Sequence, residues 1–482
     1  MKIYIGIDVG TTSVKAVAID ENGKKLASAK SAYELHADGV KVTQSALDWW
    51  CAVCDSIKEI LEGLRKLYSD VEVVAISSSA QGGSTTALDA SGTPMIEAMT
   101  WMDKRATAEC EEFKTELGAD KFYSRFGWIP QPSADASKLL WLKRNSQELY
   151  KNAICFTSTL GYVNYRLTGK IVEDPSCAAI RRLYDFTKGE YDKEILDYLS
   201  LDESKLPEVM PSAAVIGNLC RDAADALGLD TNVKVIVGAH DQYCSSIGSG
   251  IVNAGELLLA TGTAWVLFGV TEKALFSESR ISPCKHPTGK YGVLATVSGI
   301  GATLEWFSAL CNTPIPELDI GAKTRIGKSD SFFFRPSASG TGLLIGKSLG
   351  AHITGLSVGH DKYDIALALM EGAAFEAALV IEEFRKSGMD HVTSLTMNGG
   401  ASKSPLWRSI VANVTGLDVK VSAESDSASL GAAILAASKG DAERLLALCK
   451  PAGESTVTSP DENREYYKKK FAAYLEWRAT HD

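Results

Sequence analysis

The sequence predicts an α/β protein built from two related domains, and two observations lead to this prediction. Helical and strand-like hydrophobic patterns alternate along the 482 residues, as is typical of α/β folds. A strand, a polar turn and a second strand occupy residues 3–20, and the same pattern returns at residues 255–269. A pattern that repeats half a chain later indicates a duplicated fold, with a seam near residues 249–255. A chance match is the alternative, because Gly-Thr turns are common.

The composition favours a globular protein of two or three domains. A chain of 482 residues is too long for one core, and its hydrophobic content of 45% and charged content of 23% lie in the globular range. No apolar run approaches the roughly 20 residues of a membrane helix, and the N-terminus lacks the pattern of a signal peptide. We therefore expect a cytoplasmic protein. The formal net charge of −10 argues against a nucleic-acid or acidic-membrane surface.

The ten cysteines are scattered without the spacing of a disulfide framework. Cys51 and Cys54 form one C-x-x-C pair inside residues 46–61, which have helical periodicity. No second C-x-x-C or His pair at metal spacing accompanies it. Packing inside a helix is therefore the preferred interpretation, and a metal site is the alternative.

The first hairpin has the groups that a magnesium-bound polyphosphate needs. Asp8 ends the first strand with a carboxylate, and Gly10 allows a ligand close to the backbone. Thr11, Thr12 and Ser13 then offer amides and hydroxyls as donors. Mg²⁺ prefers oxygen ligands, and phosphate oxygens accept from N–H and O–H groups. The hairpin predicts a nucleotide site, and an ordinary hairpin with a polar turn is the alternative.

A second segment, residues 235–250, presents an acid at the end of a buried-type strand. The strand is expected to end at Gly238, and a helix is expected to start near Asp241. Asp241 is either a plain N-cap or a catalytic carboxylate that accepts a proton from a substrate hydroxyl. His240 beside it is either a substrate contact or a structural histidine.

Two more glycine-rich turns resemble ligand-binding loops. Residues 395–408 predict a strand, a Gly-Gly turn and a helix, with hydroxyls at Ser402 and Ser404. Residues 298–303 form a turn before a helix that is expected from Leu304. Four donor-rich turns in one chain are hard to explain as structure alone. The last segment, from about residue 450, ends in a charged helix for which a solvated surface position is the default expectation.

In combination, these segments resemble the FGGY carbohydrate kinases, members of the actin-like ATPase superfamily. The resemblance spans about residues 1–440 and depends on the order of its pieces more than on any single loop. The matching pieces are Gly6–Ser13, Trp101–Arg105, Tyr165–Lys170, Asp241 with Gly248 and Gly250, Thr261–Thr263, Ser298–Gly301 and Gly399–Trp407.

The resemblance implies two actin-like (ribonuclease-H-like) domains flanking an ATP cleft. The expected parts are an N-terminal domain over residues 1–248, a nucleotide-binding domain over 249–445 and a helical extension over 446–482. It places Asp8 near Mg²⁺, Asp241 as general base, and Gln81, Trp101, Asp103 and His240 at the sugar. The groups expected near ATP are Thr11, Thr12, Ser13, Thr263, Gly301, Gly400, Ala401 and Ser404.

The chain departs from the family pattern where the sugar is expected. Xylulose kinases usually follow the glutamine at the position of Gln81 with a Met-His pair, and glycerol kinases have an Arg-Glu pair there. This chain has Gly82 and Gly83 instead, which widens the expected pocket, and His240 is expected to fill part of that space. A ketopentose such as xylulose or ribulose ranks first as acceptor. A longer ketose, another polyol or a sugar acid comes next.

The hypothesis is therefore an ATP- and Mg²⁺-dependent sugar kinase that phosphorylates a terminal hydroxyl. Its expected partners are a sugar and ATP, with a homodimer as the expected assembly. A nucleotide switch of the actin type is a second hypothesis, although residues 101–105 would then have no purpose. A weakly catalytic sugar sensor on the same fold is a third, and the intact Asp8 and Asp241 argue against it.

Overall fold

The computed structural model describes residues 1–262, 264–328, 331–336, 350–422, 424–449 and 456–481. The chain divides into two compact units, each made of separate stretches. The first unit comprises residues 1–252, 284–291 and 426–450, and the second comprises 253–283, 292–425 and 451–482. The expected functional boundaries after residues 248 and 445 stay a prediction.

A six-stranded sheet forms the centre of the first unit, with the strand order β14-β15-β6-β1-β2-β3. Its strands are β1 Lys2–Val9, β2 Ser13–Asp20, β3 Lys25–Ala32, β6 Glu72–Ala80, β14 Val215–Asn218 and β15 Lys234–His240. β1, β6 and β15 run parallel. The carboxyl ends of these three strands therefore meet at one edge of the sheet, the usual place for ligands in α/β folds.

A second sheet of the first unit has the order β4-β5-β8-β7-β9. Its strands are β4 His36–Asp38, β5 Lys41–Gln44, β7 Thr85–Leu88, β8 Ala98–Met99 and β9 Cys155–Ser158. Two small ladders pair β10 Val172–Glu173 with β13 Glu208–Val209, and β11 Tyr184–Asp185 with β12 Glu190–Tyr191.

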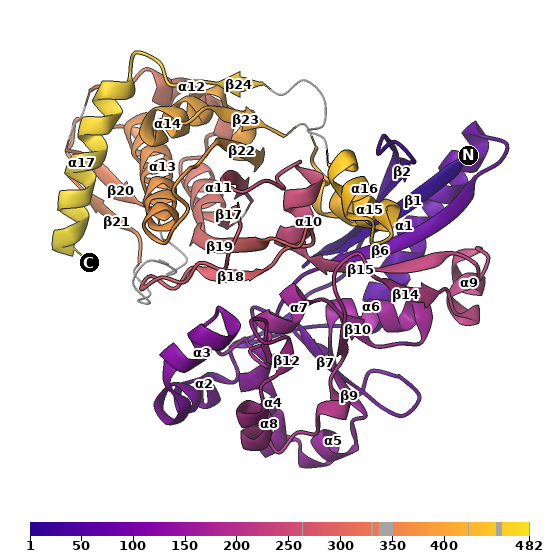
Figure 1. The fold of residues 1–482 in the computed structure, drawn as a ribbon. Coiled ribbons are helices and arrows are strands. Elements are labelled where there is room, and N and C mark those ends of the chain that lie inside the picture. The colour runs from indigo at the N-terminus through magenta and orange to yellow at the C-terminus, as the bar shows by residue number, and fades with distance from the viewer. Residues whose placement is uncertain (263, 329–330, 337–349, 423, 450–455, 482) are drawn as a thin grey trace. The chain divides into compact units, whose positions relative to one another are not determined.

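The helices of the first unit cover these sheets (Figure 1). They are α1 Ala46–Leu67, α2 Thr107–Phe113, α3 Ala119–Phe126, α4 Asp135–Asn145, α5 Gln147–Asn152, α6 Thr159–Thr168, α7 Pro175–Ile180, α8 Lys193–Leu199, α9 Arg221–Leu227, α10 Asp241–Gly248, α15 Ser427–Ser438 and α16 Ala442–Leu448, with short turns η1 Lys114–Gly118 and η2 Glu203–Lys205. Cys51 is exposed and Cys54 is buried on α1, and all ten cysteines are free thiols.

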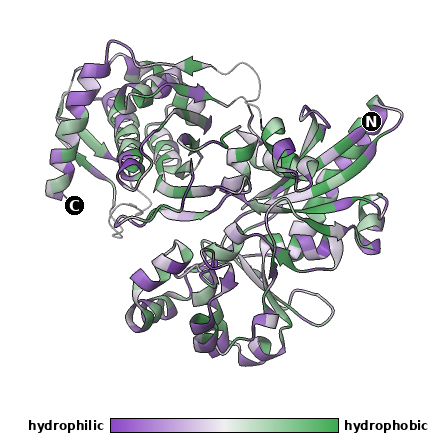
Figure 2. Ribbon diagram, in the orientation of Figure 1, coloured by the Kyte–Doolittle hydropathy of each residue, from purple (hydrophilic) through white to green (hydrophobic). Residues whose placement is uncertain are grey.

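The predicted N-terminal hairpin is confirmed. β1 pairs antiparallel with β2 from Ile3–Asp20 to Val9–Val14, and every β1 residue from Ile3 to Ile7 is buried. Figure 2 shows these strands as a largely hydrophobic band. The hairpin does not lie at the edge of its sheet, because β3 continues the sheet outside β2. The hairpin is thus held by neighbouring strands on both sides, which fixes the position of Asp8.

Helix α15 returns to the first unit from the C-terminal part of the chain and packs on β1, β6 and α10 (Figure 1). All of its residues are buried apart from Ala428. A Cβ at Gly431 would lie 1.9 Å from the carbonyl oxygen of Cys244 on α10, so only glycine allows this close packing. The helix that carries Asp241 is therefore held by a segment nearly two hundred residues away.

The second unit repeats the order of the first sheet. Its order, β18-β19-β17-β16-β22-β23-β24, matches β3-β2-β1-β6-β15-β14 from β19 onward. The pairing directions agree as well: β16 is antiparallel to β17 and parallel to β22, and β23 is antiparallel to β24. This agreement supports the duplication predicted from the repeated hairpin.

The elements of the second unit are β16 Glu256–Thr261, β17 Trp265–Thr271, β18 Ser282–Lys285, β19 Tyr291–Ser298, β20 Phe333–Arg335, β21 His352–Thr354, β22 Ser394–Gly399, β23 Val419–Val421, β24 Val457–Thr458, α11 Ile300–Leu310, α12 Ile315–Lys323, α13 Lys362–Lys386, η3 Ala401–Lys403, α14 Pro405–Thr415 and α17 Arg464–His481. The turn between β18 and β19 groups with the first unit. Helix α11 begins at Ile300, so Gly301 lies in its first turn and not in the loop before it.

The C-terminal helix α17 exposes one face to solvent, as its charges predict, and contacts helix α13 with the other. Lys470 is 5% exposed and pairs with Glu371 of α13 at 2.7 Å, and the Tyr474 hydroxyl donates to Glu376. Phe471 stacks on Phe375 with ring centroids 5.5 Å apart. Hydrophilic and hydrophobic residues alternate along this helix in Figure 2. Two of its charged residues, Lys470 and Arg478, pair with Glu371 and Glu376 of the buried helix α13, a tertiary effect that the sequence pattern does not reveal.

Candidate active site

Asp8 lies at the carboxyl end of β1, one residue before the strand ends. Its neighbours are set by strand register: Ser79 of β6 on one side and Lys15 of β2 on the other. Ser79 Oγ donates to Asp8 Oδ1 at 2.8 Å. Lys15 Nζ lies 3.4 Å from Asp426, the residue just before α15. Asp8 is thus an acid in a small polar cluster.

The pKa of Asp8 is raised to about 6, first by burial and next by the negative charge of Asp241. The hydrogen bond from Ser79 and the charge of Lys15 act in the opposite direction. Like charges raise a carboxyl pKa only when they are near each other. Asp8 and Asp241, far apart in the sequence, are therefore near each other at the carboxyl edge of the first sheet.

Asp241 is the first residue of α10. Of the two interpretations of Asp241, the plain N-cap is wrong, because β15 continues to His240, whose Nδ1 accepts from the Gln242 amide at 3.4 Å. The Asp241 side chain is 31% exposed. Its Oδ1 atom is buried, and among the described residues it has no hydrogen-bond partner. His240 Nδ1 is 3.2 Å from this oxygen, but it already acts as an acceptor toward Gln242.

Gln81 and Trp101 are linked to the tip of the first hairpin. Gln81 is 3% exposed, and its Nε2 donates to Gln44 Oε1 at 2.7 Å. Gln44 in turn donates to the carbonyl oxygen of Thr11. Trp101 is 46% exposed, and its indole N–H donates to Thr11 Oγ1 at 3.1 Å. The structure thus joins three of the predicted site residues, Gln81, Trp101 and Thr11, in one hydrogen-bonded group.

The other tip residues differ in exposure. Thr12 is exposed, Ser13 is buried, and the backbone turn is closed by a 3.1 Å bond from the Gly10 amide to the Ser13 carbonyl. The Thr12 carbonyl accepts from the amide of Tyr33 at 3.2 Å. The tip is therefore a fixed turn rather than a free loop.

Asp103 is fully buried, and its carboxylate is occupied by internal donors. It accepts from the Val42 amide at 2.9 Å and from Arg105 Nε and Nη2, the latter at 2.7 Å. The Arg105 amide adds a further bond of 3.0 Å. A role as sugar ligand stays a prediction, and it requires Arg105 to release at least one of these oxygens.

In the second unit, Thr261 brings two predicted loops together. The Thr261 carbonyl accepts from the Gly400 amide at 3.0 Å, and Thr261 Oγ1 accepts from the Ala401 amide at 3.2 Å. Gly399 has φ of +87°, and a Cβ there would lie 2.6 Å from the Thr261 carbonyl oxygen. Thr263, the predicted phosphate contact, lies outside the described residues.

Ser404 is the N-cap of α14, since its Oγ accepts from the Trp407 amide at 2.9 Å. The same hydroxyl donates to Asp319 of α12 at 2.5 Å. Gly301 lies at the N-terminal turn of α11, where helix amides lack partners within the helix. These positions supply backbone donors and hydroxyls, which suit a neutral or anionic ligand.

The sequence analysis missed Lys15, Ser79 and Asp426. Lys15 was detectable, because a hairpin with a four-residue tip places it opposite Asp8. Ser79 ends the strand that follows α1, but only the parallel register shows that it faces Asp8. No local sequence pattern could identify Asp426, because its partner Lys25, at 2.8 Å, lies 401 positions away in the sequence.

The donor set fits Mg²⁺ better than a metal that needs a closed protein cage. The described residues contain no group of three or more His, Cys, Asp or Glu side chains that could hold a metal ion. Mg²⁺ typically takes one or two carboxylates and fills its remaining positions with water and phosphate oxygens. Asp8, with Asp241 nearby, matches that requirement.

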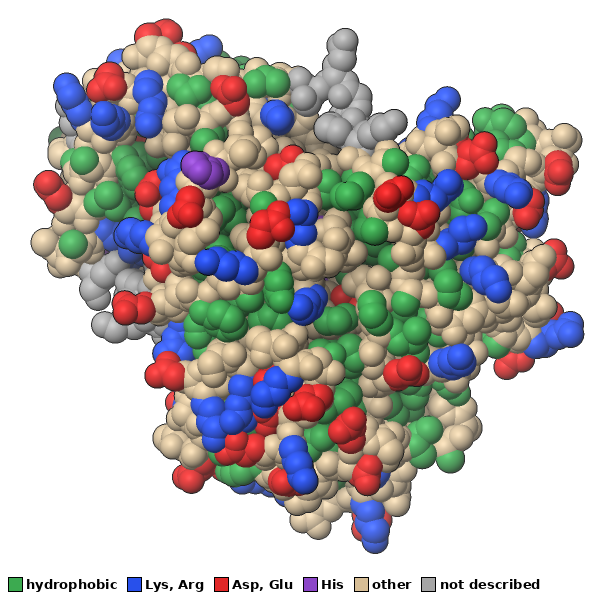
Figure 3. All heavy atoms as spheres, in the orientation of Figure 1, with side chains coloured by type: hydrophobic (Ala, Val, Ile, Leu, Met, Phe, Trp, Pro, Cys, Tyr) green, Lys and Arg blue, Asp and Glu red, His purple; other side chains and the backbone are tan. Residues whose placement is uncertain are grey.

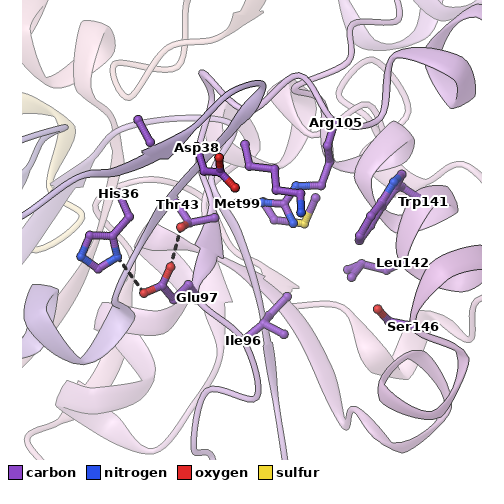
Figure 4. A pocket seen from close by; sticks show the side chains of 12 residues that line it. His36, Asp38, Thr43, Ile96, Glu97, Met99, Arg105, Trp141, Leu142 and Ser146 are labelled. Carbon is purple, nitrogen blue, oxygen red and sulfur yellow. Dashed lines mark hydrogen bonds and ion pairs between the residues drawn. The ribbon is translucent and has the colours of Figure 1, made fainter.

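One cavity of the first unit lies apart from the predicted site residues. It has a volume of about 480 Å³, and none of the predicted site residues lines it. Figure 4 shows His36 and Thr43 bonded to Glu97 on one side and Trp141 on the other. Arg105, which binds Asp103, forms part of its wall. Figure 3 likewise shows acidic and basic side chains intermixed on one face of the molecule.

Two family models match the chain. The N-terminal domain model of the FGGY family of carbohydrate kinases matches residues 3–248, and the C-terminal domain model matches residues 257–439. The chain belongs to the FGGY family of carbohydrate kinases. It is therefore an ATP-dependent sugar kinase, and the predicted family, α/β fold and enzyme class are confirmed.

Relatives of this kinase act on more than one kind of acceptor. The xylulose kinase of Staphylococcus epidermidis is 26% identical over 98% of this chain and 96% of that protein. The ligand-bound xylulose kinase structure from Lactobacillus acidophilus superposes with a TM-score of 0.91 at 26% identity, covering 100% of this chain and 98% of that one. The gluconate kinase structure from the same organism gives 0.90 at 26% identity, covering 99% and 98%. Among the residues described, no helix has the length and apolar character to cross a membrane.

Proposed function

We propose that this kinase transfers the γ-phosphate of ATP to a terminal hydroxyl of a small ketose, with a ketopentose such as xylulose or ribulose as the preferred acceptor. The observation that carries the proposal is the carboxylate of Asp241. It stands at the end of a buried strand, and its buried Oδ1 has no hydrogen-bond partner among the described residues. A buried acceptor without a partner is unusual in a folded protein. A substrate hydroxyl would supply the missing donor.

In this proposal Asp241 orients the acceptor hydroxyl and takes its proton. The hydroxyl oxygen forms a bond to the γ-phosphorus, the bond between that phosphorus and the β,γ-bridging oxygen breaks, and ADP leaves with the bond electrons. Gln81, Trp101, Asp103 and His240 bind the sugar. The fixed arrangement of Asp241 contributes by positioning, since phosphoryl transfer needs little covalent chemistry from the protein.

Asp8 is the proposed Mg²⁺ ligand, and when bound the metal would neutralise charge on the phosphate oxygens. Lys15 beside Asp8 adds a positive charge on the same side. Thr11, Thr12 and Ser13 are proposed phosphate contacts in the first unit. Thr263, Gly301, Gly400, Ala401 and Ser404 are the proposed nucleotide contacts of the second.

The relatives support the choice of acceptor. Xylulose kinases from several bacteria match over nearly the whole chain, with 26% identity for the protein from Escherichia coli. A sugar acid is the second candidate, because a gluconokinase from Bacillus subtilis is 24% identical over 89% of this chain. We also propose a homodimer and a cytoplasmic location, for which ten free thiols are suitable.

The test is an ADP-release screen with ketopentoses, ketohexoses, a ketoheptose, aldonates and polyols as acceptors. The proposal expects the highest kcat/KM with a ketopentose. A preference for an aldonate would contradict the proposal that a ketopentose is the acceptor. ADP release that no acceptor stimulates would contradict a kinase role for the chain and favour a nucleotide switch. Tight sugar binding without turnover would favour a sensor.

A further inference from the structure

The ring of His240 occupies the space that a side chain at residue 82 would need. A Cβ built on Gly82 would lie 2.5 Å from His240 Cδ2 and 2.7 Å from Nε2, closer than real contacts allow. Ile180 Cδ1 would be 2.8 Å away. Gly82 does not have the positive φ that demands glycine, in contrast to Gly83 at +68°. Space alone therefore requires glycine at this position.

The imidazole is held in its position from three sides. The His240 amide donates to Ser176 Oγ at 3.0 Å, which anchors the backbone. Nδ1 accepts from the Gln242 amide at 3.4 Å, and the ring lies edge-on to Tyr243 with centroids 6.1 Å apart. Because Nδ1 accepts, the proton of the neutral ring is on Nε2. Within the described part of the chain, no hydrogen bond to Nε2 occurs.

The contact between His240 and Gly82 lies among the predicted sugar groups. His240 directly precedes Asp241, and Gly82 directly follows Gln81. A Cβ at Gly83 would lie 3.4 Å from the Cβ of Trp101, so Trp101 is also close to this turn. All of these residues belong to the first unit. The volume beside the proposed base is therefore bounded by the imidazole.

We propose that His240 and Gly82 act as a reciprocal pair that limits acceptor length, an inference that rests on the proposed function. The imidazole closes the wall beside Asp241 and presents an Nε2–H donor to an oxygen of the acceptor. A five-carbon ketose fits against this wall, and ketoses of six or seven carbons meet the ring. His240 is thus a specificity-determining residue, and Gly82 is the position that makes room for it.

His240→Asn is the main test variant, because asparagine keeps an N-cap acceptor for α10 while removing the ring. The readout is kcat/KM for a ketopentose, a ketohexose and a ketoheptose. We expect the ratio of the longer ketoses to the ketopentose to rise at least tenfold, the scale on which pockets discriminate single carbons. A ratio that stays within twofold of the wild-type value would overturn the inference and leave the proposed function intact.

Gly82→Ala tests the reciprocal relation. In the wild-type background the added methyl group meets the imidazole, so we expect a lower melting temperature and a loss of ketopentose kcat/KM. In the His240→Asn background the same substitution should cost clearly less in both measurements, because only the terminal methyl group of Ile180, which can shift, remains too close. Equal losses in the two backgrounds would overturn the pairing, and the thermal measurement gives this answer whatever the acceptor is.

His286→Asn serves as the control, since it removes another buried imidazole of the first unit that also contacts α10. It should leave the acceptor ratio unchanged, and a change as large as that of His240→Asn would count against a specific role for His240. If the wild-type protein phosphorylates none of the ketoses, both the proposed function and this inference are wrong. This result differs from an unchanged acceptor ratio in an active enzyme, which would overturn the inference alone.

Discussion

The two hairpins of this molecule share a topology and differ in chemistry. In the first unit the β1–β2 hairpin carries Asp8, which faces Ser79 across the parallel ladder. At the corresponding place in the second unit, Ala260 of β16 faces Asn398 of β22. One copy of the duplicated fold thus ends in an acid, and the other ends in neutral donors and acceptors around Thr261. The two units thus share a strand arrangement, and the side chains at their strand ends differ in charge and chemistry.

Removal of the proposed base, Asp241, should have the largest effect on activity. Asp241→Asn keeps the size of the side chain but removes the proton acceptor, so we expect kcat to fall about 10²–10⁴-fold. The KM for ATP should change little, because Asp241 is assigned to the acceptor. The measurement is steady-state kinetics of acceptor-dependent ADP release. Near-normal turnover would remove the general-base role.

Asp8→Asn tests whether the acid of the first hairpin costs stability. The folded pKa of about 6 exceeds the ordinary value of 3.8, so the folded protein becomes less stable as pH rises through this window. At pH 7 the cost is fully present. The shift corresponds to at most about 3 kcal/mol, and partial exposure of Asp8 reduces this to about 2 kcal/mol.

We therefore expect Asp8→Asn to raise the free energy of unfolding at pH 7 while activity and Mg²⁺ affinity fall. Urea unfolding and a Mg²⁺ titration of activity provide the two measurements. Asp20→Asn, at the other end of the same hairpin, is the matched control. It removes a carboxylate that accepts from the Asn22 and Lys24 amides and should not increase stability. A stability that falls equally in both variants would contradict the account.

Acid should destabilise the first unit through His286. This buried histidine is bonded to Ser246 of α10 at 2.8 Å and to Thr288 at 2.7 Å, and burial lowers its pKa to about 3. The unfolded chain binds a proton near pH 6.5, so stability is lost as pH falls below that value. The expected loss at pH 5 is about 2 kcal/mol.

The check is urea unfolding at pH 7 and pH 5 for the wild-type protein and for His286→Asn. The variant should lack most of this pH-dependent loss, although it is less stable at pH 7. An equal loss on acidification in both proteins would assign the effect to other groups.

The smallest expected effect belongs to the neutral hairpin of the second unit. Thr261→Val keeps the β-branched shape and removes the hydroxyl that accepts from the Ala401 amide. We expect the KM for ATP to rise about tenfold, equivalent to about 1.4 kcal/mol. The KM for the acceptor should not change. Thr271→Val, at the other end of β17, is the control, since the Thr271 hydroxyl donates to the nearby Lys273 carbonyl at 2.8 Å.

Local patterns predicted much of the fold. Alternating apolar residues gave the hairpin at residues 3–20, and its repeat at 255–269 gave the duplication that the strand order supports. Asp8 and Asp241 were predictable because acids rarely end buried strands without a reason. The alternative interpretation of Asp241 as a plain N-cap failed because His240, an uncommon capping residue, caps the helix instead.

Long-range contacts could not be predicted in the same way. The return of α15 to the first unit depends on tight packing at Gly431, and no local pattern marks its partner on α10. Nor does the sequence show that the Arg105 guanidinium pairs with the carboxylate of Asp103. The space over Gly82 was expected to be partly filled by His240, and the structure confirms it. What remained hidden was that this packing leaves no room for a side chain at residue 82.

The central claim is that Asp241 of the first unit accepts the proton of a ketose hydroxyl during transfer from ATP. The most direct measurement follows the sugar phosphate itself by phosphorus NMR, with ATP, Mg²⁺ and a ketopentose, for the wild-type protein and Asp241→Asn. The account predicts one sugar phosphate formed per ADP in the wild type and a rate at least about 10²-fold lower in the variant. Equal rates of sugar phosphate formation in the two proteins would contradict it.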